Sequence, residues 1–359
     1  MSKIRFVASD GLPGVAATLA KGGRRVLVPV EKPAASKPSV VFAPYEPGVT
    51  MTLAKATVPP KAAVLPECET LMTFRKSRDA ADLNQTTVEL SATEEAQPTV
   101  VFACRTCDAR GFAALDKPFL EGLYPDPYYK ARRDRLTVVS LTCATGCETC
   151  FCHWVGGGPT SPIGSDVLIT EIEGGYVLQA MTQAGEELLE ATGLPDGADK
   201  FPLAEAARKA AWATLVPAPN LKAAQESLKA MFDDEAFWEA ETARCISCGA
   251  CTYFCPTCYC FNITDEGEPQ SPCGGRRLRS WDNCMSSLYT REASGHNPRA
   301  EKFQRMRNRV SHKFWTYPEN WGPFLCSGCG RCITNCPVCL DIRAIVLDAV
   351  AAAGSKAGA

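Results

Sequence analysis

Residues 245–256 read Cys245-Ile-Ser-Cys248-Gly-Ala-Cys251-Thr-Tyr-Phe-Cys255-Pro256. The pattern recurs at residues 326–337 as Cys326-Ser-Gly-Cys329-Gly-Arg-Cys332-Ile-Thr-Asn-Cys336-Pro337. Both copies space four cysteines as C-x2-C-x2-C-x3-C, with a glycine after the second cysteine and a proline after the fourth. Such a specific repeat within one chain indicates two loops of the same kind.

This spacing is the one by which bacterial ferredoxins hold [4Fe–4S] clusters. Each iron of a cubane takes a soft thiolate ligand, and three cysteines at intervals of three let a tight loop wrap one face of the cluster. In two-cluster ferredoxins the fourth cysteine of a run ligates the other cluster. The spacing therefore predicts two [4Fe–4S] clusters, one held by Cys245, Cys248, Cys251 and Cys336, and the other by Cys326, Cys329, Cys332 and Cys255.

Zinc is the alternative metal for cysteines spaced in this way. Structural zinc sites use two C-x2-C pairs separated by a longer loop. Two complete runs that each carry four cysteines and a proline match that arrangement poorly. We therefore favour iron–sulfur clusters and an electron-transfer role.

Composition limits the class of protein. The chain has 359 residues, 20 cysteines and a formal net charge of −2, so nothing in its overall charge favours binding to nucleic acid or to a membrane surface. In a chain of this length, cysteines in C-x2-C spacing favour metal ligands in a reducing compartment over a disulfide framework. We see no apolar signal segment and no run of 18 apolar residues, so we expect a cytoplasmic protein without direct membrane insertion. Attachment to a membrane complex through a partner remains compatible with this expectation.

The N-terminal half shows an α/β pattern. Buried strands are predicted at 99–103 and 135–141, with a helix at 109–121 between them, and each strand runs directly into a group of cysteines. A hairpin is predicted from 166–172 and 175–180. Ligands of open α/β sheets bind at the carboxyl ends of the strands, which is where the cysteine groups fall.

We expect four parts along the chain. They are an α/β domain with a cysteine-rich cluster site at 1–182, a mainly helical connector at 183–236, an α+β two-cluster ferredoxin-like domain with a long insertion at 237–350, and a flexible tail at 351–359. The connector contains amphipathic helices near 203–215 and 221–232, and a third helix at 235–243 leads into Cys245. Residues 68–75 are interpreted as a possible helix.

The insertion between the two cysteine runs is basic. Residues 276–313 contain ten Lys or Arg and three Asp or Glu. Three interpretations are a nucleic-acid patch, a docking face for an acidic partner, and compensation of the negative charge of two nearby clusters. We favour charge compensation, with docking as a secondary role, and we expect no nucleic-acid binding because that needs more than local charge.

Six further cysteines form the N-terminal cysteine group: Cys104, Cys107, Cys143, Cys147, Cys150 and Cys152. Four thiolates from this group could hold a third cubane. A zinc site, or buried thiols that pack as small hydrophobic side chains, are the alternatives. Residues alone give only a modest preference for iron–sulfur here.

Several short motifs of the sequence match a known family. They are Cys107-Asp108-Ala-Arg-Gly-Phe, Asp126-Pro-Tyr-Tyr, Thr149-Cys150-Phe-Cys152, Cys255-Pro-Thr-Cys-Tyr-Cys-Phe261, Trp281-Asp-Asn-Cys284, Ser294-Gly-His-Asn-Pro-Arg299 and Arg309-Val-Ser-His-Lys-Phe314. Through these motifs, residues 55–345 resemble the family of the iron–sulfur β subunit of cytoplasmic sulfhydrogenase and the A subunit of anaerobic sulfite reductase.

The resemblance implies an iron–sulfur subunit that links a flavin- and NAD(P)H-binding subunit to a terminal redox module, of the sulfite reductase, hydrogenase or heterodisulfide reductase type. It also implies a third [4Fe–4S] cluster, because the family's recurring N-terminal cysteines correspond to Cys107, Cys143, Cys150 and Cys152. Cys104 and Cys147 depart from the family pattern, and either could replace one of these four.

Some features stay open at this stage. Cys258, Cys260, Cys273 and Cys284 are either buried thiols, which we favour, or a further metal site. No G-x-G-x-x-G or phosphate-binding loop is present, so we do not expect this chain to bind NAD or FAD itself. An alternative function is catalysis on a sulfur species or disulfide at the N-terminal cysteine group, suggested by the two extra cysteines Cys104 and Cys147.

Overall fold

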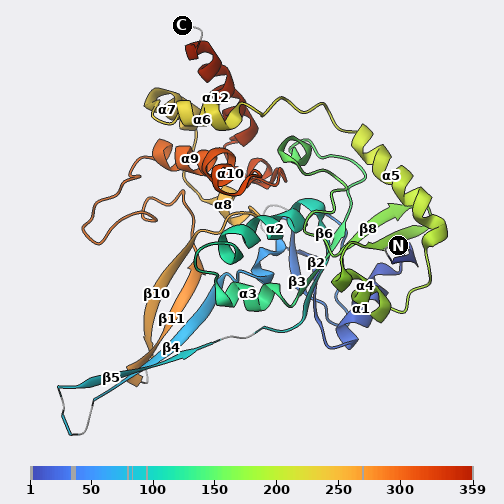
Figure 1. Ribbon diagram of the computed structural model, residues 1–359, viewed down its shortest axis with the longest axis horizontal. Coiled ribbons are helices and arrows are strands. Elements are labelled where there is room, and N and C mark those ends of the chain that lie inside the picture. The colour runs from blue at the N-terminus through green and yellow to red at the C-terminus, as the bar shows by residue number, and fades with distance from the viewer. Residues whose placement is uncertain are drawn as a thin grey trace.

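The computed structural model describes residues 3–33, 38–78, 81–82, 84–93, 96–268 and 271–357. Within these residues, Figure 1 shows a central sheet with helices on both faces, a second sheet that projects from one side, and a helical region above them. The central sheet has seven strands in the order β1-β9-β8-β7-β6-β2-β3, and the projecting sheet has four in the order β10-β11-β4-β5.

The central sheet is mixed. Its strands are β1 (Ile4–Ala8), β2 (Arg25–Lys32), β3 (Ser39–Pro44), β6 (Thr99–Arg105), β7 (Leu136–Leu141), β8 (Val167–Ile172) and β9 (Gly175–Ala180). β2, β6, β7 and β8 are parallel neighbours, whereas the outer pairs are antiparallel. The predicted strands at 99–103 and 135–141 and the hairpin β8–β9 are confirmed, because their apolar runs are buried as expected.

Helices cover both faces of this sheet. Val100 and Phe102 of β6 pack with α1 (Leu12–Lys21) and α4 (Gln183–Ala191), whereas Val101 packs on the opposite face with α2 (Thr106–Leu120) and α3 (Pro127–Arg133). α5 (Phe201–Ala213) lies along β8. The helix expected at 109–121 is therefore confirmed as α2. We did not predict α1, whose first turn contains Pro13 and Gly14, although proline is well tolerated at that position.

The projecting sheet joins distant parts of the chain. It consists of β4 (Cys68–Arg78), β5 (Thr86–Ala92), β10 (Phe261–Glu268) and β11 (Ser271–Trp281), and β11 pairs antiparallel with β4. The possible helix at 68–75 was wrong, because these residues form β4. Their partner strand is about two hundred residues away in the sequence, and such a pairing leaves no local pattern. The sheet therefore draws strands from both sides of the boundary expected at residue 237.

The helical region surrounds the two cysteine runs. It contains α6 (Ala224–Ala230), α7 (Glu235–Thr242), α8 (Ala250–Tyr253), α9 (Lys302–Ser311), a π-helical turn at His312–Thr316, α10 (Tyr317–Trp321), α11 (Arg331–Thr334) and α12 (Ile342–Ala357). Trp238, Met306, Phe314 and Ile345 belong to its buried core. These four residues lie outside the repeated motifs, so side chains from other parts of the chain build a core around the two cysteine runs.

The tail expected at residues 351–359 lies largely within a helix. α12 continues to Ala357 and lies at the top of Figure 1, where it packs against α6. Its last turns are rich in alanine, which has the highest intrinsic helix propensity and so favours continuation of the helix. Residues 358–359 of the expected tail lie outside the described residues.

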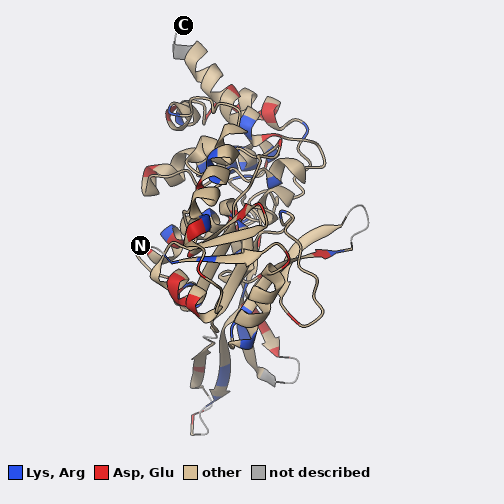
Figure 2. Ribbon diagram, turned by 90° about the vertical axis from the view of Figure 1, so that its right-hand side faces the viewer, with Lys and Arg blue, Asp and Glu red and all other residues tan. Residues whose placement is uncertain are grey.

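No helix in the described part of the chain combines the length and the apolar character needed to cross a membrane. Figure 2 shows basic and acidic residues interspersed over the ribbon. The basic residues of the insertion include several that are buried, among them Arg305, Arg309 and Lys313.

Candidate metal centres

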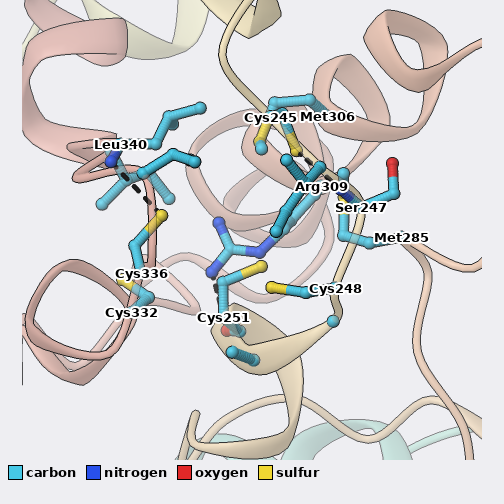
Figure 3. A pocket seen from close by; sticks show the side chains of 15 residues that line it. Cys245, Ser247, Cys248, Cys251, Met285, Met306, Arg309, Cys332, Cys336 and Leu340 are labelled. Carbon is cyan, nitrogen blue, oxygen red and sulfur yellow. Dashed lines mark hydrogen bonds between the residues drawn. The ribbon is translucent and has the colours of Figure 1, made fainter.

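The first cavity contains the four cysteines that the spacing assigned to one cluster. Cys245, Cys248 and Cys251 line it from the first run, and Cys336 lines it from the second run. Figure 3 shows the side chain of Arg309 between the cysteines of the first run and Cys336. Met285, Met306, Leu340 and Ile342 complete the lining with apolar groups.

The second cavity contains the other four. Cys326, Cys329 and Cys332 line it together with Cys255 from the first run. The two cavities share Arg309, Cys332 and Ile342 in their linings, so they are neighbours. The exchange of the fourth cysteine between the runs is thus present in the geometry.

Both runs fold in the same way because of their glycines. Gly249 has φ +77° and immediately precedes α8, and Gly330 has φ +74° and immediately precedes α11. A side chain at Gly249 would also place its Cβ 2.8 Å from the amide group of Asn283, and one at Gly330 would overlap the carbonyl group of Thr149. Only glycine therefore allows the sharp turn that spaces the cysteines around each cavity.

Backbone N–H groups point at several cysteine sulfurs. The Ser247 N–H lies 3.4 Å from Cys245 Sγ, the Gly328 N–H lies 3.4 Å from Cys326 Sγ, and the Leu340 N–H lies 3.3 Å from Cys336 Sγ. Such hydrogen bonds favour the thiolate form and tune the potential of sulfur-ligated metal centres.

Buried cations lie against the same cysteines. Lys313 is buried and its Nζ lies 3.4 Å from Cys255 Sγ and 2.9 Å from Thr257 Oγ1. Arg309 is buried and donates to the Cys251 carbonyl at 2.9 Å. Among the described residues, Arg309 Nε and Ser327 Oγ have no hydrogen-bond partner. Buried charges need an opposite charge nearby, so these groups suit a net negative group such as a four-thiolate cubane.

The pKa values show the same balance. Burial raises the pKa of the Cys326 thiol to about 11, so the fold alone disfavours its thiolate. Burial by itself lowers the pKa of Lys313, but the adjacent Cys255 and Cys258 sulfurs more than reverse this, and the net shift is upward. The donor set and the cations together fit [4Fe–4S] clusters in both cavities.

The N-terminal cysteine group lies at the carboxyl ends of parallel strands. Cys107 is in the first turn of α2, directly after β6, and Cys143 follows β7. The Lys55 ammonium lies 3.3 Å from Cys150 Sγ and 3.6 Å from Cys147 Sγ. Burial raises the pKa of the Cys107 and Cys152 thiols, and the nearby Lys55 ammonium partly offsets this effect. Cys143 is an electrostatic neighbour of Cys152 and raises its pKa further. Of the four expected ligands, Cys150 thus lies beside the Lys55 ammonium, and Cys107 and Cys152 are its electrostatic neighbours.

Three members of this group differ from the rest. Cys147 and Cys150 form a disulfide, and a cysteine must be a free thiolate to ligate iron. Ligation by Cys150 thus requires this bond to be reduced. Cys104 is 1% exposed and packs in the core with Val101, Phe112 and Leu115, as a buried thiol does.

The N-terminal cysteine group contacts the second run directly. The Phe151 N–H donates to the Gly328 carbonyl at 2.8 Å, and Arg110 donates to the Cys326 carbonyl at 2.6 Å. Asp108 and Arg331 form a fully buried ion pair, with Arg331 Nη2 2.9 Å from Asp108 Oδ2. Arg331 lies between Cys329 and Cys332 in the sequence, so the pair joins α2 to the loop of the second cavity.

Sequence reasoning did not give these supporting residues a role. Asp108 and Arg110 belong to a motif shared with the family, and that motif was the available indication. Lys55 had none, because its approach to the cysteines depends on the fold.

The remaining candidates are placed as follows. Cys258, Cys260 and Cys284 line a separate cavity, whereas Cys68 and Cys273 are exposed on the projecting sheet. His153 Nε2 bonds to the Val216 carbonyl at 2.9 Å rather than to a cysteine. Within the described residues, no three His, Cys, Asp or Glu side chains are grouped so that they could hold a single metal ion.

Comparisons with known proteins agree with the cysteine geometry. Residues 244–340 match the model of the 4Fe-4S dicluster domain, which spans both runs and the insertion. Sulfhydrogenase 2 subunit beta of Pyrococcus furiosus is 30% identical over 257 residues, which cover 70% of this chain and 73% of that protein.

Proposed function

The chain belongs to the sulfhydrogenase β-subunit family, and on that premise we propose that it relays single electrons between a flavin- and NAD(P)H-binding subunit and a terminal redox module. It is an iron–sulfur electron-transfer subunit. The observation that supports the relay best is the pair of neighbouring cavities, each lined by cysteines drawn from both runs.

Each cavity would hold one [4Fe–4S] cluster. Cys245, Cys248, Cys251 and Cys336 would ligate the first cluster, and Cys326, Cys329, Cys332 and Cys255 would ligate the second. When bound, a [4Fe–4S] cluster takes up or releases one electron.

The chain's own residues would tune that exchange. Arg309 and Lys313 compensate negative charge, and N–H groups such as those of Gly328 and Leu340 hydrogen-bond to cysteine sulfurs. Met285, Met306 and Phe151 exclude water from the cavities, which lowers the local dielectric constant and strengthens these interactions.

A third [4Fe–4S] cluster would be held by Cys107, Cys143, Cys150 and Cys152, with Cys147 as the alternative to Cys150. Its place next to the second run, through Phe151 and Gly328, suits a chain of redox centres. Lys55 would compensate its charge in the way that Lys313 does at the second cavity.

Paired serine variants test this third cluster. In the anaerobically reconstituted chain, Cys150→Ser should remove about four iron atoms, the content of one cubane, whereas Cys147→Ser should keep them. The reverse result would assign Cys147 as the ligand. Full iron content in Cys150→Ser, Cys107→Ser and Cys152→Ser alike would rule the cluster out.

The proposed partners follow from the family and from the lack of a dinucleotide-binding motif in this sequence. With no dinucleotide fingerprint in the sequence, NAD(P)H and flavin would be bound by another subunit. The terminal module would be of the sulfite reductase, hydrogenase or heterodisulfide reductase type. Isolation of the native complex with identification of the co-purifying subunits tests this: recovery of the chain without a flavoprotein would contradict it.

The alternative of sulfur or disulfide catalysis at the N-terminal cysteine group rested on Cys104 and Cys147. Burial of Cys104 in the core counts against its part in such chemistry. We therefore retain the relay as the function of this region.

A further inference from the structure

A third cavity of about 380 Å³ lies beside the second one, between the segment after Cys255 and the helix α9 with its π-helical turn. Cys260, Cys284, Tyr289 and Arg299 are among its lining residues. Cys260, Tyr289 and Arg299 are partly exposed, and Cys284 is buried. Its volume falls in the range of small-molecule sites.

Two of its thiols interact with each other. The Cys284 thiol and backbone N–H hydrogen-bond to the Cys260 sulfur, and the Tyr289 hydroxyl donates to the same sulfur. These bonds lower the pKa of Cys260, which favours the nucleophilic thiolate. Two sulfurs that share a hydrogen bond can also join as a disulfide when the electrons have an acceptor.

The cavity is positively charged. Arg299, Arg309 and Lys313 line it, and the described lining residues include no carboxylate. Arg309 and Lys313 already bond to the Cys251 carbonyl and to Cys255 and Thr257. The Arg299 guanidinium has no hydrogen bond or ion pair among the described residues, so it is free to bind an anion.

A redox centre would lie next to this cavity. Arg309 and Lys313 line both the third and the second cavity. Cys258 lines the third cavity and hydrogen-bonds to Cys255, which lines the second. Electrons held in the second cavity would therefore have a short path to the thiol pair.

We propose that the third cavity is a thiol–disulfide site at which Cys260 and Cys284 reduce a small anionic disulfide, using electrons from the neighbouring clusters. This rests on the proposed electron relay.

Each bond change is balanced. The Cys260 thiolate attacks one sulfur of the disulfide RSSR, forms Cys260–S–S–R and releases RS⁻, which takes a proton from water. Cys284 loses its proton and attacks the Cys260 sulfur, which forms the Cys260–Cys284 disulfide and releases the second RS⁻. Two electrons, which the neighbouring clusters would supply one at a time, and two protons would then restore the thiols.

A single-turnover experiment tests the site. The full chain with its clusters is reduced, freed of reductant, and mixed with dithiodiglycolate, a small disulfide with two carboxylates, while cluster absorbance is followed. Wild type and Cys273→Ser, whose cysteine is exposed on β11, should be reoxidised at the same rate. Cys260→Ser and Cys284→Ser should be slower by at least about a hundredfold, as expected on loss of a nucleophile.

Arg299→Gln separates charge recognition from reactivity. This variant should need a roughly fivefold to tenfold higher concentration of dithiodiglycolate to reach the half-maximal rate. The concentration of neutral hydroxyethyl disulfide that gives the half-maximal rate should be unchanged. Equal effects on both disulfides would overturn the anion preference.

The outcome separates this inference from the relay. Clusters that reduce and reoxidise with ferricyanide but ignore dithiodiglycolate, or equal rates in Cys260→Ser and wild type, would overturn the thiol site alone. A chain that binds no clusters would overturn the relay. In that case mass spectrometry still tests the reactivity of the two thiols. Treatment of wild type with dithiodiglycolate should produce a Cys260–Cys284 disulfide, and absence of this disulfide would contradict the proposed thiol–disulfide site.

Discussion

Lys313 carries a buried ammonium group 3.4 Å from the Cys255 sulfur. An unpaired charge in such a place costs several kcal/mol, yet the nearest partners are cysteines and the Thr257 hydroxyl. A cluster with net negative charge would supply the missing partner. Lys313 is therefore the residue at which the need for a cluster is clearest.

Lys313→Met should lower the reduction potential of the second cluster by on the order of 100 mV, because a nearby positive charge stabilises the more negative reduced form. Potentiometric titration followed by electron paramagnetic resonance measures the shift. Lys313→Arg keeps the charge, and Lys229→Met changes an exposed lysine, so both should stay close to wild type. An unchanged or higher potential in Lys313→Met would contradict the role of this lysine.

The buried Asp108–Arg331 ion pair is expected to contribute to the stability of the fold. Asp108→Ala should lower the free energy of unfolding by about 3–5 kcal/mol, because it leaves the buried Arg331 guanidinium unpaired. Anaerobic unfolding in guanidinium chloride measures it. Asp265→Ala breaks the exposed pair with Arg277 and should leave stability unchanged within error. Similar losses in both variants would contradict the structural importance of the buried pair.

At the scale of elements, each cysteine loop depends on a left-handed glycine followed by a short helix. Gly330→Ala should prevent assembly of the second cluster, because a methyl group would strain the backbone and overlap the Thr149 carbonyl. Iron content should fall by about four atoms per chain.

Gly14→Ala is the matched control. Gly14 lies in α1 with nothing within 4 Å of its added Cβ, so the change should keep all iron and stabilise the helix by up to about 1 kcal/mol. Full iron content in Gly330→Ala would show that the loop tolerates a side chain.

Elements with local patterns were predictable. β6, β7 and the β8–β9 hairpin follow from apolar runs and turn glycines, and the cysteine sets of both cavities follow from spacing. β4 was not predictable, because its pairing with β11 joins distant segments. Lys55 and Arg331 could not be assigned for the same reason: their contacts exist only after the α/β part has docked on the second run.

At the scale of the whole molecule, the α/β part and the helical region form one connected structure. The projecting sheet takes strands from both sides of residue 237. Asp108, Arg110 and Phe151 connect the N-terminal cysteine group to the second run. Such fixed contacts suit a subunit that holds its redox centres in constant relation to each other, in contrast to a small mobile carrier.

Anaerobic analysis of iron and acid-labile sulfide in the reconstituted full chain tests the central claim most directly. Two clusters at the repeated runs require about eight iron and eight sulfide per chain, and the third would raise both to about twelve. Well under eight iron atoms per chain after reconstitution would contradict the two-cluster assignment and the electron relay built on it.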